Sequence, residues 1–388
     1  MTRPAPLVRE RIATLAVFLA NGFGIGAWAV EVPRIKESLA LSDTQLGFAL
    51  FAFALGAIIA MPLAGKLAPR FGSGRATALL AAAFVVALPL PALMPNLVSL
   101  CAVLIVLGAA NGALDVSMNG HASAIEAQWR APIMSSFHAG WSAGGLLGAA
   151  TGAMLQKAGV GVVGGLALPD AFIAALMLAA ASIALREQGP RSLKPAPGFA
   201  LPSGAVMKLA GLAFLCMMVE GAVADWSAVF LRSALAGDAS IAALGYSAFA
   251  LSMAACRIVG DVSVRRFGPS TVVALGGLVA AAGLALVLGL PNVVTACVGF
   301  GLVGIGLANI VPVIFSAAGR STATPAIGVS MAATAGYAGF LVGPPLIGLG
   351  AGFVGLRLAL CVLLMAALVV CLVGGKAVRQ PDAPVTAH

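Results

Sequence analysis

The sequence predicts an all-α polytopic membrane protein with twelve transmembrane helices, on the strength of two observations. Hydrophobic residues make up 61% of the chain and charged residues only 9%, whereas a soluble domain carries about 25% charged residues. Apolar runs of roughly 20 residues, the length that crosses a bilayer, recur along the whole chain. A membrane barrel would instead show shorter segments of alternating polarity. The expected spans are residues 12–31, 46–66, 76–94, 97–121, 132–154, 165–185, 208–231, 241–260, 270–289, 293–317, 325–348 and 353–373.

Lysine and arginine are distributed as this topology requires. If the N-terminus lies in the cytoplasm, 17 of the 22 basic residues fall in cytoplasmic segments and the other five fall outside. This is the positive-inside bias of membrane proteins, and it predicts that both termini are cytoplasmic. The net charge of +9 therefore reflects orientation in the bilayer, and we expect no nucleic-acid partner.

The chain shows none of the motifs of metal, nucleotide or nucleophile sites. Its six cysteines lie within predicted helices without CxxC or Cys/His ligand spacing, which predicts neither a disulfide framework nor a metal site. No GxxxxGKS phosphate loop and no nucleophile elbow occur. We therefore expect no cofactor, no enzyme activity, and no energy supply from ATP bound to this polypeptide.

The chain contains an internal repeat that pairs each helix of the first half with the sixth helix after it. Short matches recur at an offset of 196 in residue number, and one recurs at 198. Internal duplication of this kind is common in membrane proteins that have a pathway between two bundles. The matches are Phe18-Leu19 with Phe214-Leu215, Arg70-Phe71-Gly72 with Arg266-Phe267-Gly268, Ala139-Gly140-Trp141 with Ala335-Gly336-Tyr337, and Gly108-x-x-Asn111 with Gly306-x-x-Asn309.

The repeat divides the chain into two six-helix bundles, residues 1–185 and 208–388. Between them, residues 186–207 contain proline, glycine and basic residues, which is typical of a cytoplasmic linker. Ser42 and Gln45 are spaced as a capping box that opens the second helix.

Four segments give the chain a resemblance to a known family. GKLAPRFGSGR (65–75), within two six-helix halves, resembles the major facilitator superfamily, and the likeness covers the whole chain. DVSMN (115–119), PIMSSFHAGWS (132–142) and EGAVADWSA (220–228) resemble a bacterial branch of largely uncharacterised inner-membrane transporters near the fucose–proton symporters. The resemblance implies a multi-pass secondary transporter of the bacterial inner membrane that works by alternating access. Its expected partners are a small-molecule solute, protons and the lipid bilayer, and we expect a monomer.

The resemblance also implies residues that gate the pathway. Pro69 stands where the family's loop usually has an acid, whereas the second copy of the motif, RIVGDVSVRRFG (257–268), keeps the acid. Arg257 and Asp261 are spaced i, i+4 and can pair as a latch that holds one conformation. The gating residues implied in this way are Arg70, Arg257, Asp261 and Arg266.

Three functions stay open, and one is preferred. The arginine in helix four and the Gly-Pro in helix five that mark drug–proton antiporters are missing, and Gly343-Pro344-Pro345 occurs in helix eleven instead. We therefore prefer solute–proton symport of a small polar metabolite, such as a sugar or cyclitol derivative. The alternatives are proton-driven efflux of amphipathic compounds and a transporter-like membrane sensor.

Ionisable residues inside the predicted spans are candidates for proton coupling. A carboxylate at the centre of a spanning helix costs about 2.5–3.5 kcal/mol, so it faces protein or water rather than lipid. Burial disfavours the charged form, which lets a carboxylate bind and release a proton, and histidine suits a proton relay. An interhelical hydrogen-bond network that only holds the bundle together is the alternative. The candidates are Glu220, Asp115, His138 and Asp225.

Amide and aromatic side chains near these acids are candidates for substrate binding. Residues 111, 115, 119 and 123 are spaced four apart and form one polar stripe on a helix. By the repeat, Glu220 corresponds roughly to Asn21, whereas Asp225 lies about 140° around the helix from Glu220 and points elsewhere. Aromatic rings can stack on a sugar face or anchor helix ends at the membrane interface. The candidates are Asn21, Asn111, Asn119, Trp141, Asn309 and Tyr337.

Overall fold

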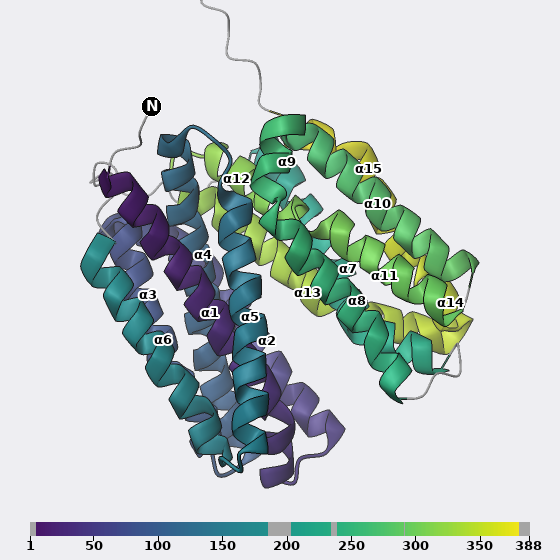
Figure 1. The fold of residues 1–388 in the computed structure, drawn as a ribbon, viewed down its shortest axis with the longest axis horizontal. Coiled ribbons are helices and arrows are strands. Elements are labelled where there is room, and N and C mark those ends of the chain that lie inside the picture. The colour runs from purple at the N-terminus through teal and green to yellow at the C-terminus, as the bar shows by residue number, and fades with distance from the viewer. Residues whose placement is uncertain (1–4, 185–202, 234–238, 291, 380–388) are drawn as a thin grey trace, which may run out of the picture. The chain divides into compact units, whose positions relative to one another are not determined.

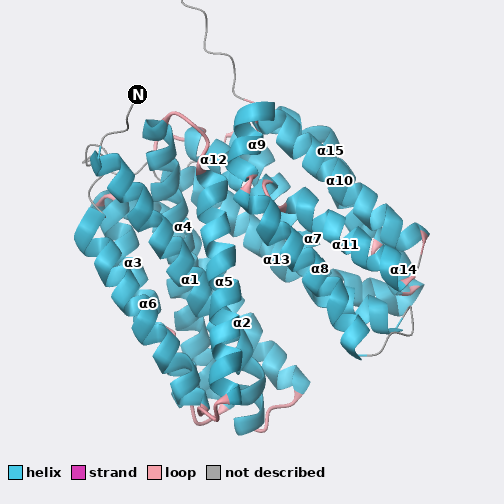
Figure 2. Cartoon of the chain, in the orientation of Figure 1, coloured by secondary structure: helices cyan, strands magenta, loops and turns pink. Residues whose placement is uncertain are grey.

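The described part of the protein is built from helices. A computed structural model describes residues 5–184, 203–233, 239–290 and 292–379, and within these ranges helices are joined by short loops and no strand occurs (Figure 2). The all-α fold class predicted from the sequence is confirmed. Residues 186–202 of the predicted linker lie outside the described residues, and from Gly204 onward the predicted linker is already helical.

The first of two compact units comprises Met1–Leu201 and Thr322–Thr334. Within it α1 packs against α5 and α6, while α2 and α3 pack against α4 (Figure 1). Ser330, from the second of these segments, donates its hydroxyl to the carbonyl of Met61 on α2 at 3.0 Å. The helices of unit 1 are α1 (Ala5–Ser38), α2 (Asp43–Phe71), α3 (Ser73–Ala87), η1 (Leu90–Leu93), α4 (Leu97–Trp129), α5 (Met134–Lys157) and α6 (Val162–Ala184).

The second unit comprises Pro202–Ser321 and Ala335–His388. Within it α7 packs against α8 and α15, and α11 packs against α8 and α10 (Figure 1). The long helix α13 (Pro325–Val354) contributes residues 325–334 to unit 1 and the rest to unit 2. The other helices of unit 2 are α7 (Gly204–Ser233), α8 (Ala239–Ile258), α9 (Gly260–Phe267), α10 (Pro269–Gly289), α11 (Val293–Leu307), α12 (Ile310–Arg320), α14 (Leu356–Ala359) and α15 (Cys361–Ala377).

Most helices have the length and composition of membrane spans. Among the described residues, ten segments are long and apolar enough to cross a membrane, and α8 with α9 makes an eleventh if this bent pair is one span. The helix α5 is not among them, although its 24 residues are a sufficient length. Gly, Ser and Ala make up much of α5 in place of larger apolar residues, and these small residues serve close packing.

Local signals at helix ends agree with the sequence. Ser42 accepts a hydrogen bond from the backbone N–H of Gln45, and the Gln45 side chain accepts one from the backbone N–H of Ser42. The predicted capping box is therefore confirmed. At the other end of the same helix, Gly72 has a φ of 84°, and Gly268 of the second Arg-Phe-Gly has a φ of 77°. Glycine adopts a positive φ without the steric cost that other residues meet, so the repeated Arg-Phe-Gly ends a helix in both halves.

Close helix packing is repeated as well. In unit 1, a Cβ on Gly144 of α5 would overlap the carbonyl oxygen of Leu19 on α1. In unit 2, a Cβ on Gly339 of α13 would overlap the carbonyl oxygen of Phe214 on α7. Gly339 follows Gly144 by the same number of residues as Phe214 follows Leu19. The pair α13 and α7 is therefore equivalent to the pair α5 and α1. Small residues that let backbones approach closely are the usual basis of helix packing in membranes.

These contacts shift two of the predicted matches by one residue. Leu19 corresponds to Phe214, whereas the sequence paired it with Leu215. By the same interval, Trp141 corresponds to Gly336 rather than to Tyr337. The predicted register of these two matches is therefore wrong, although the helices that they relate are the predicted ones.

Contacts between other helices correct a third match, that of Gly108 with Gly306. A Cβ on Gly108 would overlap the carbonyl oxygen of Phe53, and a Cβ on Gly304 would overlap the carbonyl oxygen of Phe249. Gly108 therefore corresponds to Gly304, and its predicted match with Gly306 is wrong.

The same close contacts change the residue of the first half to which Glu220 corresponds. The interval that relates Leu19 to Phe214 at the close contacts also relates Ile25 to Glu220. Glu220 thus corresponds to Ile25, and its predicted correspondence with Asn21 is wrong. Short matches in a chain rich in alanine and glycine cannot locate one-residue insertions between the halves.

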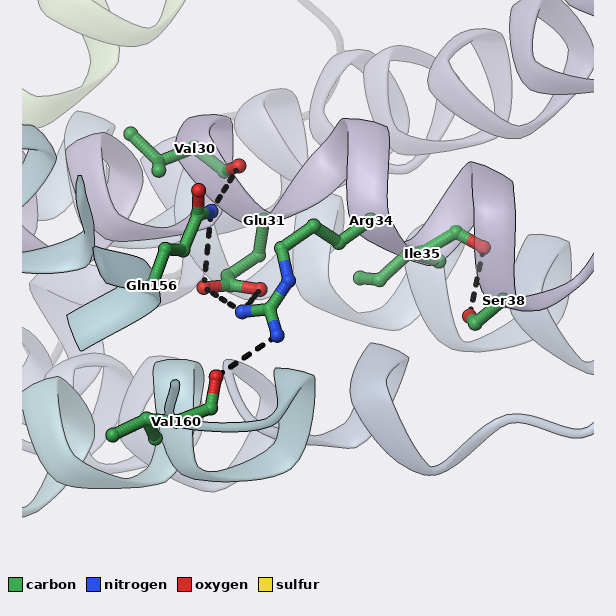
Figure 3. Close-up of polar contacts among 7 residues, drawn as sticks. All are labelled: Val30, Glu31, Arg34, Ile35, Ser38, Gln156 and Val160. Carbon is green, nitrogen blue, oxygen red and sulfur yellow. Dashed lines mark hydrogen bonds and ion pairs between the residues drawn. The ribbon is translucent and has the colours of Figure 1, made fainter. Parts of the chain in front are cut away.

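A buried ion pair ties one end of α1 to α5 and to the turn before α6. The side chain of Glu31 is fully buried and accepts hydrogen bonds from Nη1 of Arg34 at 3.0 and 3.2 Å (Figure 3). Gln156 of α5 donates to Glu31 at 3.4 Å and to the carbonyl of Val30 at 2.9 Å. Arg34 also donates to the carbonyl of Val160 at 2.8 Å. The cluster therefore joins α1 to segments that are distant in sequence.

We expect Gly144→Ala to destabilise the protein by about 1–3 kcal/mol, the usual cost of overpacking. The added methyl group would meet a backbone carbonyl, which cannot move aside as a side chain can. Thermal unfolding of the detergent-purified protein measures the effect. The matched control is Gly47→Ala on α2, where nothing lies within 4 Å of the added carbon, and it should be neutral or slightly stabilising. Equal melting temperatures for the two variants would contradict this packing.

We expect Arg34→Ala to destabilise the protein more than the double variant Glu31→Gln, Arg34→Ala does. Removing one partner of a buried ion pair costs about 3–5 kcal/mol, and Arg34 is 28% exposed, so the lower end applies. The single variant leaves a charged carboxylate buried, whereas the double variant leaves a neutral amide. Melting temperatures of both variants provide the comparison. A double variant that unfolds at a lower temperature than Arg34→Ala would show that the ion pair does not stabilise this end of α1.

Candidate functional site

Three of the predicted substrate-binding residues form one cluster in unit 1. Nδ2 of Asn21 on α1 donates to Oδ1 of Asn111 on α4 at 2.9 Å. Oδ1 of Asn21 accepts from Nε1 of Trp141 on α5, also at 2.9 Å. Both asparagines are buried and Trp141 is half-buried. The cluster joins α1, α4 and α5 through hydrogen bonds between side chains. Trp141 takes part through its indole N–H, and the faces of its ring are not used in this hydrogen bond.

A second cluster of predicted residues lies further along α4. Nδ2 of Asn119 donates to the carbonyl of Asp115 at 2.9 Å and to its Oδ1 at 3.2 Å. Oδ1 of Asn119 lies 3.1 Å from Nε2 of His138 on α5. The other carboxylate oxygen of Asp115, Oδ2, is buried and has no hydrogen-bond partner among the described residues. Asp115 therefore has one acceptor oxygen that no hydrogen bond from the described residues satisfies.

Sequence reasoning missed a polar network between α3 and α4. Oγ of Ser73 lies 2.9 Å from Nδ1 of His121, and Oγ1 of Thr77 lies 3.0 Å from Oγ of Ser117. His121 is fully buried. Its position six residues after Asp115, in a helix with no other histidine, was the available signal.

In unit 2, two helices are broken at neighbouring points. The helices α8 and α9 meet at Val259 with a 60° bend, and Ala308 and Asn309 separate α11 from α12. Broken helices leave carbonyls that need new donors where water is scarce. Nε of Arg257 donates to the carbonyl of Ala308 at 3.1 Å, and Nδ2 of Asn309 donates to the carbonyl of Cys256 at 3.2 Å. Each break therefore supplies a donor that the other needs.

Glu220 lies beside these breaks. Its Oε1 is 3.9 Å from Nη2 of Arg257, and its side chain is 22% exposed while that of Arg257 is almost fully buried. The two atoms are too far apart for a hydrogen bond. The pair is therefore held by electrostatic attraction between the two charges. Arg257 consequently links a partly exposed carboxylate on α7 to the break between α11 and α12. Oδ1 of Asn309 is buried without a partner among the described residues.

The remaining predicted residues lie in different surroundings. Asp225 is exposed on α7 and lines a hollow with Trp226. Tyr337 is half-buried on α13. Tyr246 on α8, one of only two tyrosines in the chain, lies within electrostatic range of both Glu220 and Asp225. Sequence reasoning missed Tyr246, and its rarity within a predicted span was the signal.

The predicted gating residues fall into two groups. Arg257 and Asp261 are both buried, on either side of the break between α8 and α9, and their role as a latch stays a prediction. Arg70 is exposed at the end of α2, and Arg266 is exposed at the end of α9 over the ring of Phe267. Among the described residues no group of three His, Cys, Asp or Glu side chains could hold a metal ion.

Comparison with solved structures identifies the fold. The chain matches a crystal structure of the E. coli fucose:proton symporter FucP with a TM-score of 0.81 and 15% identity, over 97% of this chain and 100% of that one. It matches the proton:xylose symporter XylE, bound to 6-bromo-6-deoxy-D-glucose, with a TM-score of 0.78 and 14% identity, over 97% and 96% of the two chains. At this identity the likeness concerns the fold alone.

Comparison with sequences identifies the family. The chain is 36% identical over 362 residues to an uncharacterized MFS-type transporter of Yersinia pestis, covering 93% of this chain and 94% of that protein. It is 34% identical over 354 residues to membrane protein MosC of Rhizobium meliloti, covering 91% and 86%. The profile of the Major Facilitator Superfamily matches residues 14–219. The chain therefore belongs to the major facilitator superfamily, as a multi-pass membrane transporter rather than an enzyme.

Proposed function

We propose that the protein is a proton-coupled symporter of a small polar solute, such as a sugar or cyclitol derivative. It works by alternating access in the bacterial inner membrane with both termini in the cytoplasm. The observation that carries this proposal is the link from Glu220 through Arg257 to the carbonyl of Ala308. This link joins a partly exposed carboxylate to a broken helix, so a change of charge at one end alters the contacts at the other.

The proposed coupling depends on what Arg257 does when Glu220 binds a proton. A protonated Glu220 no longer attracts the guanidinium, which is buried and must keep its remaining partners. Arg257 then depends more on the Ala308 carbonyl and on its other contacts. Because both helices are already interrupted here, the segments can shift without breaking regular helical hydrogen bonds. Proton binding would thus change the relative stability of two arrangements of unit 2.

Unit 1 supplies a second group for the cycle. The unpartnered oxygen of Asp115 can accept a solute hydroxyl or hold a proton, and Asn119 fixes the orientation of the carboxylate. Asn21, Asn111 and Trp141 form a hydrogen-bonded patch on α1, α4 and α5. Amides, a carboxylate and an indole face are groups that recognise hydroxylated rings. These positions therefore support a polar, hydroxyl-bearing solute.

The transport activities of two structural neighbours support the same solute class. FucP is described as a fucose:proton symporter and XylE as a proton:xylose symporter. Their identity to this chain is low, so the substrate itself has to be measured.

We expect Glu220→Gln to abolish proton-driven accumulation while keeping solute exchange. Proteoliposomes under an inward proton gradient are offered a panel of labelled sugars and cyclitols, including L-fucose, D-xylose and myo-inositol. The wild-type protein should accumulate at least one of them, and a protonophore should stop accumulation. A protonophore that raises accumulation instead would indicate efflux. Asp115→Asn is tested beside it, to decide which carboxylate carries the proton.

Glu37→Gln is the matched control for this flux assay, because Glu37 is exposed at the end of α1. It should behave as the wild type does. If Glu220→Gln accumulates solute normally, the proposed coupling is wrong although the family assignment stands.

We expect Asn309→Ala to loosen the contact between the two helix breaks. Nδ2 of Asn309 holds the Cys256 carbonyl and lies 3.7 Å from the Cys256 sulfur, so its loss should expose that thiol. In a protein whose other cysteines are replaced by serine, maleimide should label Cys256 several-fold faster in the variant. Asn96→Ala, which removes an exposed helix cap on α4, is the control. An unchanged labelling rate would show that the breaks are held together without Asn309.

A further inference from the structure

Asp225 lines an open hollow of about 550 Å³ in unit 2, between α7 and α13. This volume falls within the range of small-molecule sites, roughly 300–1,000 Å³. Asp225 is the one ionisable residue among the seven that line the hollow. The other six are Trp226, Val229, Pro344, Pro345, Gly348 and Leu349.

One wall of the hollow is a fixed aromatic ring. Nε1 of Trp226 donates to the carbonyl of Pro344 at 3.0 Å. Gly348 provides space for the same ring, since a Cβ there would lie 2.9 Å from Cζ2 of the indole. The indole therefore cannot turn away without losing its hydrogen bond, and it forms a preorganised surface beside Asp225.

The carboxylate of Asp225 has no hydrogen bond or ion pair within the described part of the chain. It is exposed, and it lies in a helix that is long and apolar enough to span the membrane. A carboxylate in such a helix faces protein or water rather than lipid. The hollow therefore presents an uncompensated negative charge to whatever enters it.

The hollow lies where the second half departs from the repeat. Gly148 makes a close contact with the Phe23 carbonyl on α1, and Gly343 makes the equivalent contact with the Met218 carbonyl on α7. Gly159 and Gly355 occupy equivalent turns with positive φ. The stretch from Gly343 to Gly355 is one residue longer than the stretch from Gly148 to Gly159. This longer stretch of α13 contains both prolines of the hollow. The hollow is consequently a feature of unit 2 that symmetry with unit 1 does not explain.

We propose that this hollow binds the ammonium group of a small organic solute, with Asp225 as the counter-charge and Trp226 as the aromatic wall. An indole face attracts ammonium groups, and one carboxylate compensates one positive charge. A bound metal ion would need several oxygen ligands, and the lining residues offer a single carboxylate. A proton alone would need neither the volume nor the ring. The inference rests on the proposed function, because such a solute would be part of the transported class.

Equilibrium binding tests this site without requiring transport. The full-length protein is placed in nanodiscs of phosphatidylglycerol, and labelled probes are compared in pairs that differ in charge. Choline is paired with 3,3-dimethyl-1-butanol, and glucosamine with glucose. We expect at least one cation to bind tenfold or more tightly than its neutral partner. Asp225→Asn should remove this preference, Asp225→Glu should keep part of it, and Trp226→Phe should weaken choline binding several-fold.

Glu37→Gln serves again as the control and should bind as the wild type does. The ammonium group of a lipid could occupy the same site, so the assay is repeated in nanodiscs that contain phosphatidylethanolamine. Competition by this lipid would identify a headgroup as the occupant, and its absence would identify a soluble solute. Either result supports an ammonium site when it depends on Asp225.

Equal binding of charged and neutral probes, a preference that survives Asp225→Asn, or binding of none of the probes would overturn the inference. These outcomes are independent of the flux assay. A protein that binds cations through Asp225 but moves no solute keeps this site and loses the proposed function, and the opposite pattern loses only the site.

Discussion

The guanidinium of Arg257 is the group that holds the arrangement of unit 2 together. Inside a membrane every backbone carbonyl and every charge needs a partner from the protein, since lipid supplies none. Arg257 donates to the carbonyl exposed where α11 ends and lies beside the carboxylate of Glu220. Both Arg257 and Ala308 are buried, so neither can exchange its partner for water. The charge of one side chain is thereby connected to the geometry of two broken helices.

Elsewhere in the scaffold, close backbone contact between helices adds to the polar clusters of unit 1. Close approach of α5 to α1, and of α13 to α7, is possible because glycine stands at Gly144 and Gly339. Dispersion forces act over such interfaces in lipid, where the hydrophobic effect gives helices no reason to associate. Because the other helices are tightly packed, we expect conformational change in unit 2 to occur at the two helix breaks. This arrangement suits a transporter that alternates between conformations.

The sequence was sufficient for the helical fold and the duplication, because apolar length and repeated Arg-Phe-Gly turns depend on local chemistry. It also selected Asn21, Asn111 and Trp141, which do form one hydrogen-bonded cluster. It did not find the breaks at Val259 and Asn309, although Pro312 follows the second break and has no N–H to donate to the carbonyl of Ala308.

The contacts that accompany both breaks are long-range, and no local pattern reports them. The hydrogen bonds of the Glu31–Arg34 ion pair with Gln156 on α5 and with the Val160 carbonyl before α6 were missed for the same reason. The register of the repeat was beyond the sequence as well, because one-residue insertions are visible only where backbones touch.

The proposed coupling requires that Glu220 exchange the charge of Arg257 for a proton. Infrared difference spectroscopy of the reconstituted protein across a pH titration measures this exchange, because a protonated carboxyl group has its own carbonyl band. We expect a titrating band that disappears in Glu220→Gln and persists in Glu37→Gln. A band that is unchanged in Glu220→Gln would contradict the coupling, since the titrating carboxyl would then lie elsewhere.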